Sequence, residues 1–562
     1  MRASPAERVA PSGATVYWAL GVAALTFLAF LPTLSNGWVD FDDTVFIIKN
    51  ARLYSLSAEN LSWMFSAAHG GHYHPLTWLS WAINIAVLGA GPAGFHLTDL
   101  LLHCANAALF FFIARRLLNG SDMAAAAAAL FFSVHPLRVE SVAWAIERRD
   151  VLSGFFYLAT IMLHLKAIEA PGKHWRKLSW LAYALSLLSK GVGLTLPAAL
   201  ILLDLYPLKR KVDWREKIPY AVMAVVAAVL AISAESVNGS ALGLTQFPLT
   251  QRLATSAFGA AFYMAKTVLP INLRPLYETP QVFNPASPIF LASGAFVIVA
   301  AAALAWSRRP AWLAAAGFYA VTILPMLGLL RFGPQLAADR YSYLATMSFA
   351  LLFGGALNHA LNMNAEHRLN AQIAALVIIG GLGAQTFRQT ARWHDPVTLW
   401  SYALEINPDV AMGQQHLGYA LAGRGQYAQA VLHYKKALEL RPDYWLAWDN
   451  LGWSLAAQGM LDEACGAYEK AIALKPDYWE AHSNLGLALG RRNKLKEAER
   501  ELTTAVALAP DESGVHNNLG LVYFSEGRKE LAVQEFQKTL LLDPRAPQAR
   551  MMLERLRKPP GR

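Results

Sequence analysis

Cysteine and charge are both scarce in this chain of 562 residues. There are two cysteines, Cys104 and Cys465, and 16% of the residues are charged, against about 25% in a typical soluble domain. Two cysteines define neither a disulfide framework nor a metal site. The shortage of charge is uneven, because long apolar runs fill the chain up to 390 and the charge density rises after it. This asymmetry indicates a membrane region followed by a soluble one.

Many apolar segments are long enough to cross roughly 30 Å of hydrocarbon. They lie near 15–34, 96–117, 151–168, 178–207, 219–235, 286–306, 311–330, 343–360 and 371–388. The stretch 178–207 is long enough for two spans that break near Lys190, and 122–136 is a further short candidate. Segment 15–34 has no small-residue cleavage site after it, so we expect it to be the first span. The sequence predicts about 11 to 12 spans.

Basic residues give the expected orientation. The net charge of +10 could indicate nucleic-acid binding, but the basic clusters lie where short cytoplasmic loops are expected: Arg115-Arg116, Lys173 to Lys177, Lys209 to Lys217 and Arg308-Arg309. We therefore expect a lipid bilayer and no nucleic acid as partner. With these clusters inside, 35–95 forms a large external loop. If 251–270 is re-entrant, the C-terminal region also lies outside.

The C-terminal region repeats every 34 residues. Prolines stand at 408, 442, 476, 510 and 544, and Leu-Gly pairs begin at 417, 451, 485 and 519. This period is that of the tetratricopeptide repeat (TPR), a helical solenoid. The expected fold is all-α: a polytopic membrane domain at 1–390, a junction and half-repeat at 391–408, four repeats at 409–544, and a capping helix and tail at 545–562.

Asparagines also repeat just before the Leu-Gly pairs, at Asn450, Asn484 and Asn518. An amide both donates and accepts, so a ladder of them could hold the backbone of an extended acceptor peptide. Equally, each amide could bond only to the neighbouring repeat. The sequence is compatible with both roles of the asparagines.

An acidic loop follows the first apolar segment, with Asp40, Asp42 and Asp43 at a membrane surface. Such carboxylates are hydrated, paired, bound to metal or used as a base. A solvated loop is the simple interpretation. The functional one gains from cations that the expected topology brings to the same face: His135, Arg138, Arg149, Lys190 and Arg340. A carboxylate with clustered cations suits a reaction in which a hydroxyl attacks and a phosphate leaves.

Several motifs resemble a known family. They are Trp38 to Asp43 with Asn50, His74 to Ser80, Pro92 to Leu97, His135 to Trp144, Arg149 to Leu152, Leu202 to Asp204, and Ala338 to Tyr343. In this order they resemble the polytopic glycosyltransferases of the GT-C fold that carry C-terminal TPR repeats. Within that fold, the resemblance is to the transmembrane-and-TPR O-mannosyltransferase family and its bacterial homologues.

The resemblance implies transfer of a sugar from a polyprenyl-phosphate carrier to an exoplasmic acceptor, by an inverting displacement. It assigns the general base to Asp42 with Asp43 as its partner, or the reverse, and Asp43 could instead hold the acceptor or a metal. Arg340 and Arg149 are the candidates for the carrier phosphate, with His135, Arg138 and Lys190 behind them. Two positions depart from the family: Asp99, where Asn is more usual, and Gly191-Val192 after the lysine.

Three histidines lie close together in the external loop, at His69, His72 and His74. Three imidazoles could bind a divalent metal, but the loop is Gly-rich and lacks helical spacing. We expect His74 instead to cap or orient the following helix. His72 and His74 stay weak metal candidates, and GT-C enzymes include members with and without a metal.

The leading hypothesis is a membrane glycosyltransferase whose repeats bind a protein acceptor or partner. Its membrane would be the inner or plasma membrane in a bacterium and the endoplasmic reticulum in a eukaryote, with the acidic loop and the repeats on the exoplasmic side. The alternative is a catalytically inactive membrane-anchored scaffold. A transporter or flippase is disfavoured, because its ionisable groups should lie at mid-membrane depth.

Overall fold

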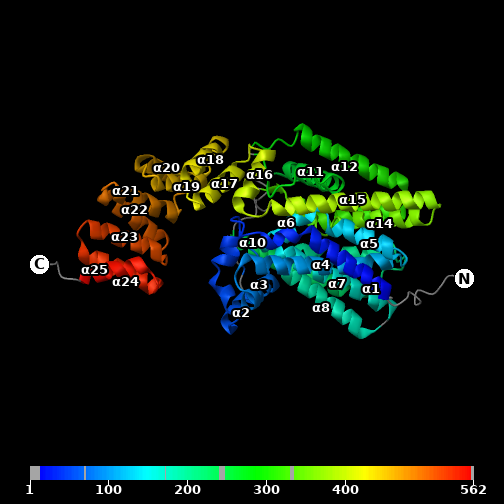
Figure 1. Cartoon of the computed structure of the whole chain (residues 1–562). Helices are drawn as coiled ribbons and strands as arrows, with labels where there is room; N and C mark the ends of the chain where they lie inside the picture. The colour runs from blue at the N-terminus through cyan, green and yellow to red at the C-terminus, as the bar shows by residue number, and fades with distance from the viewer. Residues whose placement is uncertain are drawn as a thin grey trace. The chain divides into compact units, whose positions relative to one another are not determined.

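The computed structural model describes residues 13–66, 68, 71–170, 172–238, 247–280, 282–329 and 335–557. The chain divides into two compact units, Met1–Tyr402 and Ala403–Arg562 (Figure 1). Within the described residues the only sheet is one antiparallel pair, β1 (Tyr277–Glu278) with β2 (Gln335–Ala337). The expected all-α fold is confirmed.

The first unit consists of α-helices joined by short 3₁₀ turns. Its helices are α1 (Gly13–Ala29), α2 (Ala58–Ser66), α3 (Pro75–Leu88), α4 (Pro92–Leu117), α5 (Asp122–Ser133), α6 (Val139–Ala143), α7 (Arg148–Glu169), α8 (Lys173–Ser189), α9 (Leu196–Leu205), α10 (Trp214–Asn238), α11 (Leu249–Val268), α12 (Pro288–Ser307), α13 (Pro310–Ile323), α14 (Met347–Leu361) and α15 (Ala365–Ala391). Helix α16 (Pro396–Ile406) runs across the division between the units. Four turns matter for the site: η5 (Pro136–Arg138), η6 (Ala145–Glu147), η7 (Gly191–Thr195) and η9 (Asp339–Ser342).

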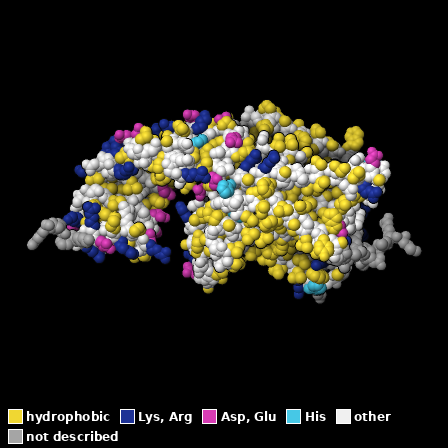
Figure 2. Space-filling model, in the orientation of Figure 1, with side chains coloured by type: hydrophobic (Ala, Val, Ile, Leu, Met, Phe, Trp, Pro, Cys, Tyr) yellow, Lys and Arg dark blue, Asp and Glu magenta, His cyan; other side chains and the backbone are white. Residues whose placement is uncertain are grey.

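Five helical segments of the described chain are long and apolar enough to cross a membrane: 92–117, 145–169, 214–234, 288–307 and 365–391. Shorter apolar helical segments lie at 13–29, 75–88, 122–133, 191–205, 310–326 and 347–361. In α4 and α7 more than half of the apolar window is buried, whereas in α12 only 6% is. Helices α4 and α7 therefore form the centre, and α12 presents its side chains outward, as the apolar surface in Figure 2 illustrates.

Small residues let the central helices approach closely. Ala124 to Ala129 of α5 are all buried, and α5 packs against α4 and α14. A Cβ on Gly354 of α14 would lie 2.6 Å from the carbonyl oxygen of Ala124, so only glycine fits at this contact. Close backbone approach of this kind is how membrane helices associate without a hydrophobic driving force.

The second unit is a stack of helix pairs. They are α17 (Ala411–Gly423) with α18 (Tyr427–Leu440), α19 (Trp445–Ala457) with α20 (Leu461–Leu474), α21 (Trp479–Arg491) with α22 (Leu495–Leu508), and α23 (Ser513–Ser525) with α24 (Lys529–Leu542), followed by α25 (Pro547–Arg557). The Leu-Gly glycine is required where the two helices of a pair meet. A Cβ on Gly452 would lie 2.7 Å from the ring of Tyr468, and Gly418 has the same relation to Tyr434.

One hydrogen bond recurs in every repeat, although the residue type that makes it varies. Six residues after each repeat proline, a side-chain nitrogen meets the carbonyl oxygen of that proline. The five contacts are Gln414 to Pro408 at 2.9 Å, Trp448 to Pro442 at 2.9 Å, His482 to Pro476 at 3.1 Å, His516 to Pro510 at 2.9 Å and Arg550 to Pro544 at 2.8 Å. Each contact satisfies a carbonyl just before a helix begins.

Candidate active site

Asp43 holds the acidic loop in place. One carboxylate oxygen accepts the backbone N–H of Val39 at 3.0 Å, and the other accepts that of Ile146 at 3.2 Å. The side chain is buried, at 1% exposure. Burial raises the pKa of Asp43 to about 8, against the lowering effect of the two N–H donors. Asp43 therefore ties the loop to η6, and both of its oxygens are occupied by backbone.

The pKa of Asp42 is also raised, but two cations act on this carboxyl group. Burial raises its pKa, and the charges of Arg149 and then Arg340 lower it. Those two arginines come from α7 and η9, which lie far from the loop in sequence. The fold thus brings Asp42 and the two leading phosphate candidates into one electrostatic neighbourhood.

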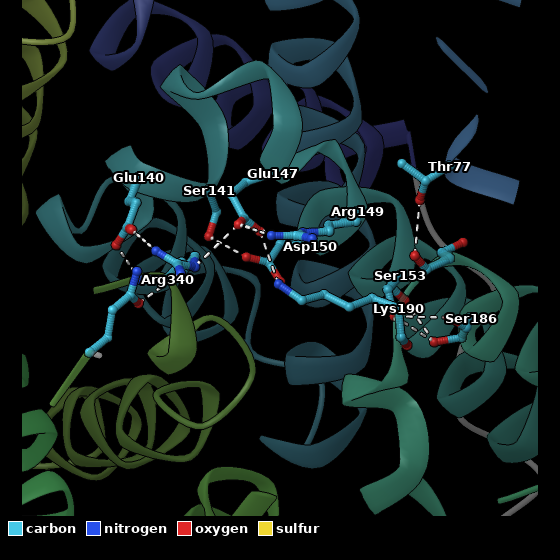
Figure 3. A network of polar contacts seen from close by, with 12 residues as sticks. Thr77, Glu140, Ser141, Glu147, Arg149, Asp150, Ser153, Ser186, Lys190 and Arg340 are labelled. Atoms are coloured by element: carbon cyan, nitrogen blue, oxygen red, sulfur yellow. Dashed lines mark hydrogen bonds and ion pairs between the residues drawn. The ribbon is translucent and has the colours of Figure 1, made fainter. Parts of the chain in front are cut away.

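The cations of the site are held by carboxylates (Figure 3). Glu147 lies at the centre, 2.6 Å from Arg149, 2.9 Å from Lys190 and 3.2 Å from Arg340. Its side chain is fully buried. A single carboxylate therefore sets the relative positions of three cations from separate segments of the chain.

Two further carboxylates complete this cluster. Glu140 forms an ion pair with Arg340 and also accepts the backbone N–H of that residue at 2.9 Å. Asp150 accepts from Lys190 at 2.7 Å and from the hydroxyl of Ser141 at 3.1 Å. Burial raises the pKa of Glu140, and Arg340 opposes that effect. The cluster of Glu140, Glu147, Asp150, Arg149, Lys190 and Arg340 is formally neutral.

The cations of this cluster were predicted as site residues from the sequence, but Glu140 and Glu147 were not. A signal was present, because buried cations need counterions. Glu140 lies within the motif His135 to Trp144, and Glu147 stands two positions before Arg149. What the sequence could not show is which carboxylate meets which cation. That depends on η6, η7 and η9 converging at the start of α7.

Arg138 and His135 lie deeper in the protein. Arg138 donates to the hydroxyls of Ser342 at 2.8 Å and Thr346 at 3.0 Å. Its burial lowers the pKa to about 10, so the side chain stays cationic at neutral pH. His135 meets the carbonyl of Thr267 at 3.1 Å, and burial lowers its pKa to about 3. Both side chains join the site segments to the helices behind them.

The two described histidines of the external loop stack on each other. The rings of His72 and His74 lie 5.4 Å apart, and Phe46 lies 6.2 Å from His72. His74 is the N-cap residue of α3, but through its backbone carbonyl rather than its side chain. Among the described residues no group of three or more His, Cys, Asp or Glu side chains has the arrangement of a metal site. His69 lies outside the described residues.

Asp99, one of the departures from the family pattern, has a structural partner. It forms an ion pair with Arg148 at 2.5 Å, and both side chains are fully buried. Arg148 also donates to Asn84 at 2.9 Å and to the carbonyl of Phe95 at 3.0 Å. This pair fixes α4 to the start of α7, immediately beside Arg149. Asp99 therefore positions the segment that supplies the site.

In the repeats, two of the three candidate asparagines contact the preceding repeat. Asn484 donates to Asp449 at 3.0 Å, and Asn518 donates to Ser483 at 3.0 Å. Asn450 is half-buried in α19. These bonds match the interpretation in which the amides join neighbouring repeats.

Comparisons with known proteins agree with this architecture. Residues 74–234 match the family described as "Dolichyl-phosphate-mannose-protein mannosyltransferase". Residues 418–459 and 454–492 match "TPR repeat", and 483–550 match "Tetratricopeptide repeat". "Protein O-mannosyl-transferase Tmtc1" of Drosophila melanogaster is 26% identical over 522 residues, covering 73% of this chain and 60% of that protein. The chain is similar in sequence to proteins named O-mannosyl-transferases of the TMTC type.

A human relative extends the comparison. "Protein O-mannosyl-transferase TMTC4" of Homo sapiens is 23% identical over 504 residues, covering 74% of this chain and 66% of that protein. The chain thus spans three fifths to two thirds of the length of these relatives. Among solved structures, "Crystal structure of MamA" shares 21% identity and covers 29% of this chain and 94% of that one, with a TM-score of 0.26.

Proposed function

We propose that this protein is a membrane glycosyltransferase that moves a sugar from a polyprenyl-phosphate carrier to a hydroxyl of an exoplasmic protein, with inversion. The observation that carries the proposal is that Asp42 lies within electrostatic range of Arg149 and Arg340, whose charges lower the pKa that burial raises. Similarity to proteins named O-mannosyl-transferases supports the reaction class.

Asp42 is the proposed general base. Its carboxylate removes the proton of the acceptor hydroxyl as that oxygen attacks the anomeric carbon of the sugar. The bond from this carbon to the carrier phosphate breaks, and its electron pair leaves with the phosphate. The two arginines favour the ionised form of Asp42 against burial. Asp43 positions the loop, because both of its oxygens accept backbone N–H groups.

The leaving phosphate is proposed to lie at the cation cluster. Arg149 uses Nε and Nη2 for Glu147, so its Nη1 edge is the side we assign to the phosphate. Guanidinium groups suit this task because they offer several N–H donors in one plane. Lys190 and Arg340 add charge from the other sides of Glu147, while Arg138 and His135 support these segments from behind.

The repeats are proposed to bind the protein acceptor or a partner on the exoplasmic side. Their helices expose polar side chains over much of the surface (Figure 2), and stacked repeats form extended binding surfaces. The alternative function is a scaffold in which the membrane unit has no turnover.

The test is donor consumption by the full chain in lipid nanodiscs, with a panel of polyprenyl-phosphate sugars. We expect one donor to be consumed and Asp42→Asn to lower the rate by about 100-fold or more. Asp40→Asn is the matched control, since Asp40 accepts from Thr44 at 2.8 Å within its own loop and should keep its rate. Turnover that survives Asp42→Asn contradicts the assigned base. A wild-type chain inert to every donor favours the scaffold.

A further inference from the structure

A large apolar cavity lies inside the first unit, away from the acidic site. Its volume is about 810 Å³, and residues of α4, α7, α9, α13 and α14 line it. The walls are aliphatic and aromatic, for example Phe110, Leu158, Leu202, Trp312 and Leu351. Sites for small ligands typically have about 300–1,000 Å³, so the space suits an organic ligand rather than a few water molecules.

Its arginine and histidine side chains belong to one end. Arg309 precedes α13, and His359 lies in the last turn of α14, and both are exposed. At the same end lie Leu117 of α4 and Pro207 after α9. The acidic site is built at the opposite end of the bundle, because Arg149 lies in the first turn of α7 and Glu147 precedes it.

Basic residues from three separate loops border this mouth. Arg115 and Arg116 end α4 next to Leu117, and Lys209 follows Pro207 by two residues. Arg308 adjoins Arg309. Arg115 is engaged with Asp122 and Arg116 with Glu169, whereas Lys209, Arg308 and Arg309 are exposed. By the excess of basic residues in cytoplasmic loops, this mouth opens at the cytoplasmic leaflet.

We propose that this cavity binds one phospholipid with an anionic headgroup from the cytoplasmic leaflet. The acyl chains occupy the apolar walls, and the headgroup phosphate meets Arg309, His359 and the neighbouring basic loops. Basic pockets between membrane helices on the cytoplasmic side are the expected binding sites for anionic lipid headgroups. A water-soluble ligand would leave its polar groups unpaired against these walls.

The occupant differs from the carrier of the proposed reaction. A carrier phosphate must reach Asp42 and the cation cluster at the other end of the bundle. The cavity's cations lie at its cytoplasmic mouth, so they hold a headgroup that takes no part in the transfer. The lipid would therefore bind whether or not the membrane unit transfers a sugar.

The test measures lipid retained by the full chain purified in mild detergent, by native mass spectrometry, after exchange into equal phosphatidylglycerol and phosphatidylcholine. We expect one bound phospholipid per chain and a preference for phosphatidylglycerol. Ala315→Trp fills the cavity wall and should abolish retention. Ala303→Trp adds the same side chain to the exposed face of α12 and should leave retention unchanged.

Charge is tested separately with Arg308→Gln/Arg309→Gln, at two exposed positions outside the packed core. Each lost arginine should weaken the phosphatidylglycerol preference by about fivefold, while one lipid stays bound. This variant decides the question even if Ala315→Trp fails to fold. Equal retention of both lipids by the wild type, bound polyprenyl phosphate instead of phospholipid, or an unchanged preference in the double variant would overturn the proposal.

Discussion

Lys190 lies 2.9 Å from Glu147 and ties the turn between α8 and α9 to the start of α7. Because Glu147 also pairs with Arg149 and Arg340, the cations of the candidate site share a counterion. The side chain that organises the site is thus the carboxylate of Glu147. The cations predicted from the sequence are held in place by it.

Replacing Glu147 by Gln should disorganise the site. The amide cannot balance three cations, and breaking a buried ion pair costs about 3–5 kcal/mol. We expect a lower unfolding temperature in detergent and loss of donor consumption. Glu169→Gln is the control, because Glu169 is exposed and pairs with the peripheral Arg116, away from the cluster. An active, equally stable Glu147→Gln protein would show that the cluster is not organised by this residue.

The Asp99–Arg148 pair predicts a non-additive result. Asp99→Asn leaves a buried guanidinium without its counterion, and we expect it to destabilise the membrane unit by about 3–5 kcal/mol. The double variant Asp99→Leu/Arg148→Met removes both charges and should be clearly more stable than Asp99→Asn. Thermal unfolding followed by tryptophan fluorescence measures both. Equal destabilisation in the single and double variants would contradict a paired role.

Asp43 should make stability depend on pH. Its pKa is about 8 in the folded chain, above the value of about 3.9 for an unperturbed aspartate. The folded state therefore binds the proton more tightly, so this stabilisation is complete below about pH 4 and is lost as the pH rises through 8. Unfolding temperatures of the wild type should fall more steeply over this window than those of Asp43→Asn. Parallel curves would contradict the assignment.

Alanine substitutions at two glycines of one repeat should change the stability of the repeats in opposite directions. Gly452→Ala places a Cβ 2.7 Å from the Tyr468 ring, and such overpacking costs about 1–3 kcal/mol. A Cβ on Gly466 of α20 would meet no atom within 4 Å, so Gly466→Ala should stabilise by about 0.5–1 kcal/mol through helix propensity. Resistance of the repeats to limited proteolysis measures both changes. A neutral Gly452→Ala would contradict the contact argument.

The repeats were predictable because their signals are local and periodic. Gly452 and Tyr468 belong to one helix pair, so the same short-range contact recurs every 34 residues. The break between two helices at Lys190 was also predictable, because Lys190 interrupts a long apolar stretch. These features need no knowledge of distant contacts.

The site was only partly predictable. Asp42 and the cations could be named from residue type and topology, but the roles of Asp43 and Glu147 arise from contacts across the fold. Asp43 meets the backbone of Ile146, 103 positions away, and Glu147 meets Arg340. Such long-range pairs leave no periodic pattern in the sequence. Residue types alone therefore did not distinguish carboxylates that position the site, Asp43 and Glu147, from the proposed base, Asp42. The assignments of Asp42 and the phosphate-binding cations stay predictions.

The bond from a side-chain nitrogen to each repeat proline carbonyl explains a repeat position at which the residue type varies. Glutamine, tryptophan, histidine and arginine occupy it, and what they have in common is a donor that reaches the same oxygen. Substitutions at this position should thus be tolerated when the new side chain can donate a hydrogen bond to the proline carbonyl, whether or not it resembles the original side chain. Trp448→Gln keeps a proton to offer, whereas the nearly isosteric Gln414→Glu sets a carboxylate against a carbonyl.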